Sequence, residues 1–329
     1  MPVMSRRQVV LGAAAAAASG VILPLARAQG AWPSKPVTIL NPFPAGGGTD
    51  AFARPWAANM GRITGKQFII DNRGGAGGTV GASVAARMPP DGHSWFMGAV
   101  HHSIAVSMYP KLDYDIEKDF IPVQIIARVP QVISVNPQKI AANDLKGFIA
   151  YLKANPGKAN YGSAGNGTAH HLAGELFKLQ TKTFITHIPY RGAGPAMTDL
   201  LGGAVDMMFD GMGTSAAQIK GGKLKAIALA ADKRSPAFPN IPTAAEQGLP
   251  DFKVSTWYAL WAPKGTPKDA IDGMVAASNK VLAQDDIKQV WFNQAADVPG
   301  LSPDEFGRFV SAEIKKWAEV VKQSGARLD

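Results

Sequence analysis

The sequence contains no cysteine among its 329 residues. Disulfide bonds, thiolate nucleophiles, and zinc or iron–sulfur centres ligated by cysteine are therefore excluded. Charged residues are also sparse, at 18%, whereas 46% of the residues are hydrophobic. This length and composition are typical of a globular protein with one large domain or two ordinary ones. They exclude a disordered chain and a small disulfide-stapled scaffold.

Long hydrophobic runs are confined to the N-terminal segment. The pair Arg6-Arg7 precedes an alanine-rich apolar run, and Ala26-Arg27-Ala28 has the small-x-small pattern of a cleavage site. We predict that residues 1–28 form a signal peptide of the twin-arginine type, cleaved after Ala28. A retained membrane anchor is the alternative, but serine, glycine and proline interrupt the run and make it a poor membrane span.

The charge of the remaining chain is moderate and spread along the sequence. Without the leader, 31 basic residues stand against 25 acidic ones, a net charge of about +6. Because the basic residues do not cluster, we expect no nucleic acid partner. No later segment approaches about 18 consecutive apolar residues without a charge. We therefore expect a soluble protein in the compartment across the membrane, the bacterial periplasm.

Strand and helix patterns alternate along the rest of the chain, which predicts parallel sheets with right-handed crossovers. The expected strands cover residues 35–41, 67–71, 94–100, 122–128, 131–135, 160–162, 184–188, 205–209, 224–230 and 254–262. The expected helices cover residues 51–63, 79–88, 144–154, 169–179, 195–201, 214–220, 267–283 and 303–324.

A succession of strand, glycine-rich loop and helix opens the chain and restarts near residue 160. This restart predicts two similar α/β lobes with a ligand cleft between them. We assign residues 29–130 and 252–329 to lobe 1 and residues 131–251 to lobe 2. The second lobe is thus inserted into the first, and the chain crosses between them twice.

Three glycine-rich loops follow strands and precede helices: Ala45–Asp50, Gly74–Thr79 and Gly162–Thr168. In open α/β sheets, ligands bind beyond the carboxyl ends of the strands, where helix N-termini offer free N–H groups to small anions. Each loop alone is equally consistent with a turn or a helix cap. Three such loops in matching positions of two lobes favour an anion-binding cleft.

Motifs for catalysis and for nucleotide binding are missing from the sequence. Neither a Walker A motif nor a dinucleotide-binding fingerprint occurs. Ser163 has Tyr161 where a nucleophile elbow requires glycine. Adjacent histidines project in different directions, so neither histidine pair alone is suited to chelate a metal. We predict no enzyme, no cofactor and no metal, with an exported hydrolase based on Ser163 and His171 as the less favoured alternative.

Polar side chains at strand ends are candidates for contacting a ligand. His101 and His102 follow the third strand and can donate hydrogen bonds to a carboxylate, although a structural role is equally open. Tyr190 and Asp210 end two later strands, and Asp210 can accept from a ligand hydroxyl or amine, or cap the following helix. Asp50 would repel an anion, so we expect it to bond the start of its helix instead.

Several segments of the chain, in this order, resemble the successive signatures of the Bug (TctC-like) family. These are extracytoplasmic solute receptors of tripartite tricarboxylate transporters, and the similarity extends over residues 32 to 329. The segments are Pro42–Asp50, Asn72–Gly78, Pro90–Gly92, Tyr161–Gly165, His187–Gly192 and Pro242–Gly248.

The resemblance implies a type II periplasmic binding protein fold, in which two lobes close around a small carboxylate without catalysis. It implies membrane subunits of a tripartite tricarboxylate transporter as partners. It also implies that the loops Phe43–Asp50 and Ser163–Thr168 grip one carboxylate, partly through ordered water. A receptor that presents its ligand to a membrane sensor kinase is the alternative, and in either case we expect a monomer.

The predicted ligand site combines these loops with the polar residues at the strand ends. Backbone N–H groups of residues 45–49 and the side chains of Ser163, Asn166 and Thr168 are expected to hold one carboxylate. The two histidines after the third strand would meet the other end, which favours a dicarboxylate or an aromatic acid over an amino acid. The complete set is Phe43, Ala45, Gly46, Gly47, Gly48, Thr49, Gly77, Gly78, His101, His102, Ser163, Asn166, Gly167, Thr168, Tyr190 and Asp210.

Overall fold

Nine strands form a mixed sheet in the part of the chain that this computed structural model describes, residues 32–326 and 328. Their order is β2-β1-β3-β9-β4-β7-β5-β6, with β8 paired to β4. The predicted signal peptide and its cleavage site lie outside the described residues. The strands are β1 (Val37–Asn41), β2 (Phe68–Asn72), β3 (Ser94–Ala99), β4 (Phe120–Val135), β5 (Asn160–Ser163), β6 (Thr186–Pro189), β7 (Met207–Gly211), β8 (Lys225–Leu229) and β9 (Ser255–Pro263).

Helices cover both ends of this sheet. The elements around β1, β2 and β3 are called the first lobe here, and those around β5, β6, β7 and β8 the second lobe. Helix α11 packs against α4, β4 and α6 and so contacts both lobes. The helices are α2 (Gly48–Thr64), α3 (Thr79–Ala85), α4 (His101–Met108), α5 (Leu145–Ala154), α6 (Ala169–Thr181), α7 (Ala193–Gly202), α8 (Met212–Lys220), α9 (Lys268–Leu282), α10 (Asp285–Asn293) and α11 (Pro303–Ser324), with short 3₁₀ turns η1 (Ala76–Gly78) and η2 (Ala245–Gln247).

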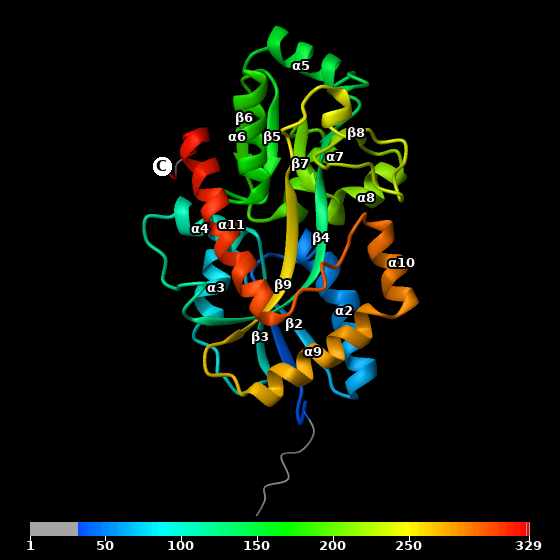
Figure 1. The fold of residues 1–329 in the computed structure, drawn as a ribbon. Helices are drawn as coiled ribbons and strands as arrows, with labels where there is room; N and C mark the ends of the chain where they lie inside the picture. Colours follow the sequence, from blue (N-terminus) through cyan, green and yellow to red (C-terminus); the bar gives the residue numbers. More distant parts are fainter. Residues whose placement is uncertain (1–31, 327, 329) are drawn as a thin grey trace, which may run out of the picture. The chain divides into compact units, whose positions relative to one another are not determined.

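The long strands β4 and β9 run side by side between the two lobes (Figure 1). They pair antiparallel as far as Pro130 and Ser255, and from Gln131 onward β4 pairs with β7 and β8 instead. One continuous strand therefore belongs to the sheets of both lobes. Because β4 leaves the first lobe and β9 returns to it, the two strands have opposite directions.

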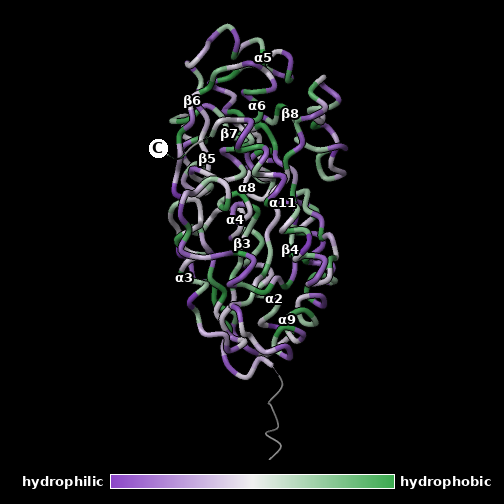
Figure 2. Tube along the Cα trace, turned by 60° about the vertical axis from the view of Figure 1, so that its left-hand side comes forward, coloured by the Kyte–Doolittle hydropathy of each residue, from purple (hydrophilic) through white to green (hydrophobic). Residues whose placement is uncertain are grey.

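The core lies on both faces of β9, where side chains alternate between two hydrophobic clusters. Trp257, Ala259 and Trp261 belong to one cluster, and the alternate residues Tyr258 and Leu260 belong to the other. A strand buried on both faces appears in the sequence as a continuous apolar run, as residues 257–262 do. On outer helices such as α9 and α5, hydrophobic and hydrophilic residues are mixed instead (Figure 2).

The alternation of strands and helices was predicted well, with three differences. The expected strands 122–128 and 131–135 are a single strand, β4. The prediction of parallel sheets is correct for β1 with β2 and β3, and for β5 with β6 and β7. It is wrong for β4 and β9, which carry the chain out of the first lobe and back. Helices α4 and α10 were not predicted; α4 is buried on nearly every side and lacks an amphipathic pattern.

Among the described helices, none has both the length and the apolar character needed to span a bilayer.

Candidate ligand-binding site

Four helix N-termini border one small cavity. Helices α2, α4, α6 and α7 begin at or beside its lining residues, and each brings the positive end of a helix dipole to this place. At the start of α6, the N–H groups of Ala169 and His171 already donate to His101 and Thr168. Such a place favours an anion. The space open to a water-sized sphere is about 10 Å³, room for roughly one water molecule. The lining residues are Phe43, Gly47, Gly48, Thr49, His101, Ala164, His170, Ala193 and Tyr258.

A wider hollow of about 510 Å³ adjoins this cavity. The cavity is lined by Gly47 and Ala193, and the hollow by the neighbouring residues Gly46 and Gly194. At this point the α2 loop of the first lobe meets the start of α7 in the second lobe. A Cβ added at Gly194 would lie 3.1 Å from the carbonyl oxygen of Ala45. We call this close approach the glycine contact.

The first glycine loop is held by a carboxylate. Asp50 accepts hydrogen bonds through Oδ2 from the backbone N–H of Gly46 at 2.9 Å and from Nε of Arg54 at 2.6 Å. Asp50 was expected to bond the start of its helix; it accepts instead from the loop residue Gly46, two residues before α2, and from Arg54. The carboxylate folds the loop back onto α2, so Gly47, Gly48 and Thr49 present their backbone to the cavity.

The second glycine loop is held by its own hydroxyl groups. Ser163 Oγ accepts from the backbone N–H of Gly165 at 3.0 Å. Thr168 Oγ1 donates to the carbonyl of Gly165 at 2.7 Å and caps helix α6. Neither hydroxyl lines the cavity, because both are directed into the loop. Ala164 is the residue of this loop that lines the cavity.

Two stacked histidines lie behind the second loop. The rings of His171 and His187 are 4.1 Å apart and nearly parallel. His187 Nε2 lies 2.6 Å from Ser163 Oγ, and His171 Nδ1 accepts from the backbone N–H of Gly167 at 3.2 Å. Burial, together with the neighbouring His171, lowers the pKa of His187 to about 3, and burial also lowers the pKa of His171. Both rings are therefore neutral at pH 7.

Two further histidines line the cavity itself. His101 Nδ1 accepts from the backbone N–H of Ala169 at 3.0 Å, so the proton of its neutral ring is on Nε2. His170 has no hydrogen-bond partner at either ring nitrogen within the described residues. Its Nε2 lies 3.6 Å from Asp210 Oδ1. Burial lowers the pKa of both histidines.

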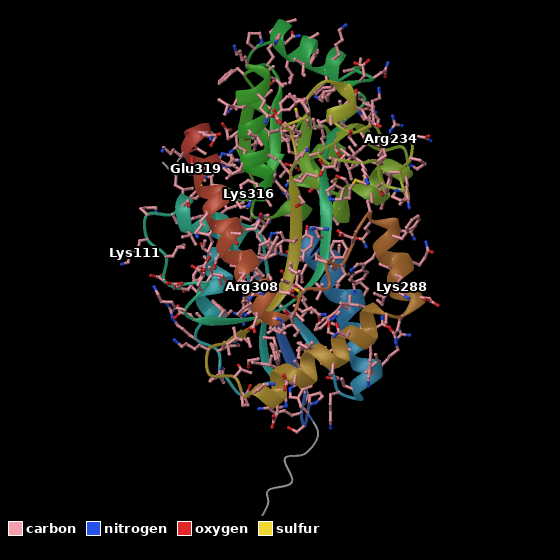
Figure 3. All side chains as sticks on the ribbon, viewed as in Figure 1. Lys111, Arg234, Lys288, Arg308, Lys316 and Glu319 are labelled. Atoms are coloured by element: carbon pink, nitrogen blue, oxygen red, sulfur yellow. The ribbon has the colours of Figure 1, made fainter. Side chains whose placement is uncertain are left out.

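The residues that line the cavity include no lysine, arginine, aspartate or glutamate. Charged side chains labelled in Figure 3, such as Arg308 and Lys316 of α11 and Lys288 of α10, project from outer helices instead. Burial raises the pKa of the Tyr258 phenol, which keeps it a hydrogen-bond donor. Within the described residues, no three His, Asp or Glu side chains are grouped to hold a metal ion.

The predicted site residues fall into three sets. Phe43, Gly47, Gly48, Thr49 and His101 line the cavity. Ala45 and Gly46 line the adjoining hollow. The remaining nine line neither space: Gly77, Gly78, His102, Ser163, Asn166, Gly167, Thr168, Tyr190 and Asp210.

Residues in this third set have other contacts. His102 is buried, with Nδ1 within 3.1 Å of the backbone N and O of Ala99. The Tyr190 hydroxyl donates to Asp199 at 2.7 Å. Asp210 Oδ2 accepts from Ser215 Oγ at 2.6 Å. Three lining residues were not predicted: His170, Ala193 and Tyr258. A fourth, Ala164, was predicted only as part of the loop Ser163–Thr168.

Two α/β lobes joined by paired strands, with a cavity at converging helix N-termini, define a solute-binding protein of the periplasmic type. A family model described as "Tripartite tricarboxylate transporter family receptor" (TctC) matches residues 52–326. The chain belongs to this family and is a periplasmic solute-binding protein of the Bug/TctC type. The family and its solved members are binding proteins rather than enzymes.

Relatives match along nearly their whole length. Protein BugT of Bordetella pertussis is 36% identical over 327 residues, covering 99% of each chain. The periplasmic binding protein BugD has a TM-score of 0.86 at 36% identity, covering 90% of this chain and 99% of its own.

Two structures from Rhodopseudomonas palustris contain ligands. Rpa4515 with adipate has a TM-score of 0.87 at 34% identity and covers 90% and 100% of the two chains. MatC (Rpa3494) with bound malate has a TM-score of 0.83 at 35% identity and covers 88% and 100%.

Proposed function

We propose that this protein captures a small organic carboxylate in the periplasm and delivers it to the membrane subunits of a tripartite tricarboxylate transporter. The observation that carries the proposal is the cavity bordered by four helix N-termini. Partial positive charges of N–H groups and helix dipoles suit a carboxylate, whose charge is otherwise costly to bury. Related structures that contain adipate and malate support this ligand class.

One carboxylate of the ligand lies, in this proposal, at the N-termini of α2 and α6. The backbone of residues 45–49 contacts it from the first lobe, and the Ser163–Thr168 loop contacts it from the second, directly or through ordered water. Ser163 and Thr168 fix the shape of their loop through the hydrogen bonds to Gly165. The ligand's other end extends toward the two lining histidines, His101 and His170.

Ligand entry requires the lobes to move apart, because about 10 Å³ does not admit even a small dicarboxylate. We propose residues 32–130 and 252–329 as one moving body and residues 131–251 as the other. The change of β4 partner between Pro130 and Gln131 supports this boundary. Opening at the glycine contact would join the cavity to the adjoining hollow and give the ligand its path.

The experiment is a thermal-melt screen of protein exported from the full-length gene, purified from the periplasm and freed of bound ligand. The panel contains malate, adipate, aromatic acids and amino acids, with uncharged controls. A ligand at about 100 times its Kd adds roughly 2.7 kcal/mol to stability, which shifts Tm by several degrees. A shift confined to carboxylates is expected; no shift with any carboxylate would overturn the proposal.

Delivery to a transporter needs a separate measurement. Labelled ligand, the loaded protein and membrane vesicles containing the two membrane subunits are combined, and uptake is followed with and without the receptor. Uptake that depends on the receptor is expected. Binding without uptake would leave carboxylate capture intact and would favour presentation of the ligand to a membrane sensor kinase.

A further inference from the structure

We infer that His170, with Asp210 behind it, recognises a second anionic group of the ligand and takes up one proton as a dicarboxylate binds. This inference rests on the proposed carboxylate capture and goes further, because it assigns the far end of the ligand to one residue. It predicts a dicarboxylate ligand rather than a monocarboxylate one.

The position of His170 is the first observation. It lies in the first turn of α6, lines the cavity and is 3% exposed. Neither ring nitrogen has a hydrogen-bond partner within the described residues. A buried polar group without a partner is costly, and such groups are satisfied in most native structures. A ligand group in the cavity would supply the missing partner.

The setting of Asp210 is the second observation. Its Oδ2 accepts from the hydroxyls of Thr214 and Ser215, which fix the carboxylate in place. Its Oδ1 has no hydrogen-bond partner within the described residues and lies 3.6 Å from His170 Nε2. A fixed negative charge beside an imidazole favours the imidazolium form. Asp210 thus opposes the effect of burial on His170.

A carboxylate arriving in the cavity would add a second negative charge beside this ring. Two negative charges together favour protonation, and the imidazolium can then donate from both nitrogens, to Asp210 and to the ligand. Hydrogen bonds between ionised groups are about twice as strong as neutral ones. A monocarboxylate brings one negative charge into the cavity where a dicarboxylate brings two, so it should induce less protonation of His170.

The other titratable groups around His170 do not replace it. His101 on α4 is 5.7 Å away between ring centroids, but its Nδ1 already accepts from the backbone of Ala169, so protonation would break that bond. His171, the next residue on α6, has its Nδ1 engaged by Gly167. Tyr258 on β9 remains protonated, and neither lysine nor arginine lines the cavity. His170 is therefore the lining histidine that gains a proton without losing a hydrogen bond.

The test is calorimetric titration near pH 7 in two buffers of different ionisation enthalpy, which counts the protons taken up on binding. Two matched pairs of ligands are compared: adipate with hexanoate, and malate with 2-hydroxybutyrate. Each pair has the same carbon number and differs by one carboxylate. The wild-type protein is expected to take up as much as one proton with the dicarboxylate that binds and distinctly less with its monocarboxylate partner.

Three variants assign the effect to a residue. His170→Gln keeps a donor but does not titrate, and it is expected to abolish proton uptake and to weaken dicarboxylate binding roughly 10- to 100-fold. Its affinity for the monocarboxylate should fall less than its affinity for the dicarboxylate. Asp210→Asn should reduce proton uptake. His101→Asn, whose Oδ1 can accept from Ala169, should retain it.

The outcomes separate this inference from the proposed function. If carboxylates bind but His170→Gln keeps full proton uptake, or His101→Asn abolishes it, the role of His170 is overturned and carboxylate capture stands. Equal affinity and equal proton uptake for each ligand pair would also overturn it. If no carboxylate binds the wild type, both proposals fail. Circular dichroism and Tm verify that each variant is folded.

Discussion

The two glycine loops at the cavity have the same local plan but are held in shape by different chemistry. Each follows a strand and leads into a helix N-terminus. The Ala45–Asp50 loop is fastened by the Asp50 carboxylate, which Arg54 also contacts. The Ser163–Thr168 loop is fastened by hydroxyls and backed by two neutral imidazoles. Similar sequence patterns therefore produce loops that should differ in their response to acid and to substitution.

The largest effect is expected from closing the cavity at the first loop. A Cβ added at Gly48 would overlap the Tyr258 hydroxyl and lie 3.0 Å from its Cζ, with Tyr258 itself buried. Gly48→Ala should weaken carboxylate binding about 100-fold or more and lower stability by about 1–3 kcal/mol, as overpacking does. Calorimetric titration and thermal melts measure both.

The control adds Tyr258→Phe to this variant, which removes the overlapping oxygen while keeping the ring. The double variant should recover part of the lost stability. A Gly48→Ala protein that binds carboxylates with wild-type affinity would contradict the assignment of this cavity as the ligand site.

The second loop is tested by removing both of its hydroxyls. Ser163→Ala with Thr168→Ala deletes the bonds to Gly165 and the cap of α6. We expect a loss of about 1–2 kcal/mol in stability, chiefly from the cap, and a drop in affinity of about tenfold or more because the loop is no longer fixed. Unchanged affinity would mean that this loop does not shape the site.

The two loops should also differ in how acid affects them, because the second loop is backed by a histidine of lowered pKa. The folded pKa of His187, about 3, is below the unfolded value of about 6.5, so the unfolded chain binds more protons between these values. The contribution of His187 to the free energy of unfolding is fully present above about pH 6.5 and is lost as the pH falls toward 3. His102, whose burial lowers its pKa to about 4, acts in the same direction.

His187→Gln, which keeps an acceptor near Ser163 but cannot be protonated, should therefore flatten the decline in Tm between pH 6.5 and 4. A His187→Gln protein that keeps the wild-type slope would show that His187 does not titrate as proposed.

The smallest effect is expected at the glycine contact. Gly194→Ala adds a methyl group 3.1 Å from the Ala45 carbonyl oxygen, so the two loops must separate by a few tenths of an ångström. Affinity should fall about 3- to 10-fold with little change in Tm. Gly202→Ala, at the other end of the same helix with no atom within 4 Å of its Cβ, is the control and should bind normally.

Local patterns in the sequence located most strands, most helices and both glycine loops. These features depend on neighbouring residues, such as the apolar spacing of α2 or the cap at Thr168. The sequence did not identify Tyr258 as a lining residue, because it stands in a uniform apolar run. Its position depends on the pairing of β9 between β3 and β4, which brings together residues more than 100 positions apart.

The histidines illustrate the same limit. His101 was selected because it follows a strand, and it lines the cavity. Its neighbour His102 has the same sequence signal but packs among Phe96, Tyr114 and Trp261. His170 and His171 differ in the same way, one directed at the cavity and the other at the loop backbone. Which member of an adjacent pair faces a site is set by helix rotation, and α4 was not recognised from its buried sequence.

The absence of lysine and arginine from the lining of the described cavity affects how a ligand leaves it. The carboxylate held by backbone dipoles at α2 and α6 forms no ion pair with a lysine or arginine that must be broken at full charge. When the lobes part, water can replace the ligand at each N–H group in turn. The rate of lobe opening should therefore set the rate of dissociation. Added salt screens buried interactions weakly and should change the off-rate little. A receptor that must deliver its ligand to a membrane partner benefits from binding interactions that are lost when the lobes open.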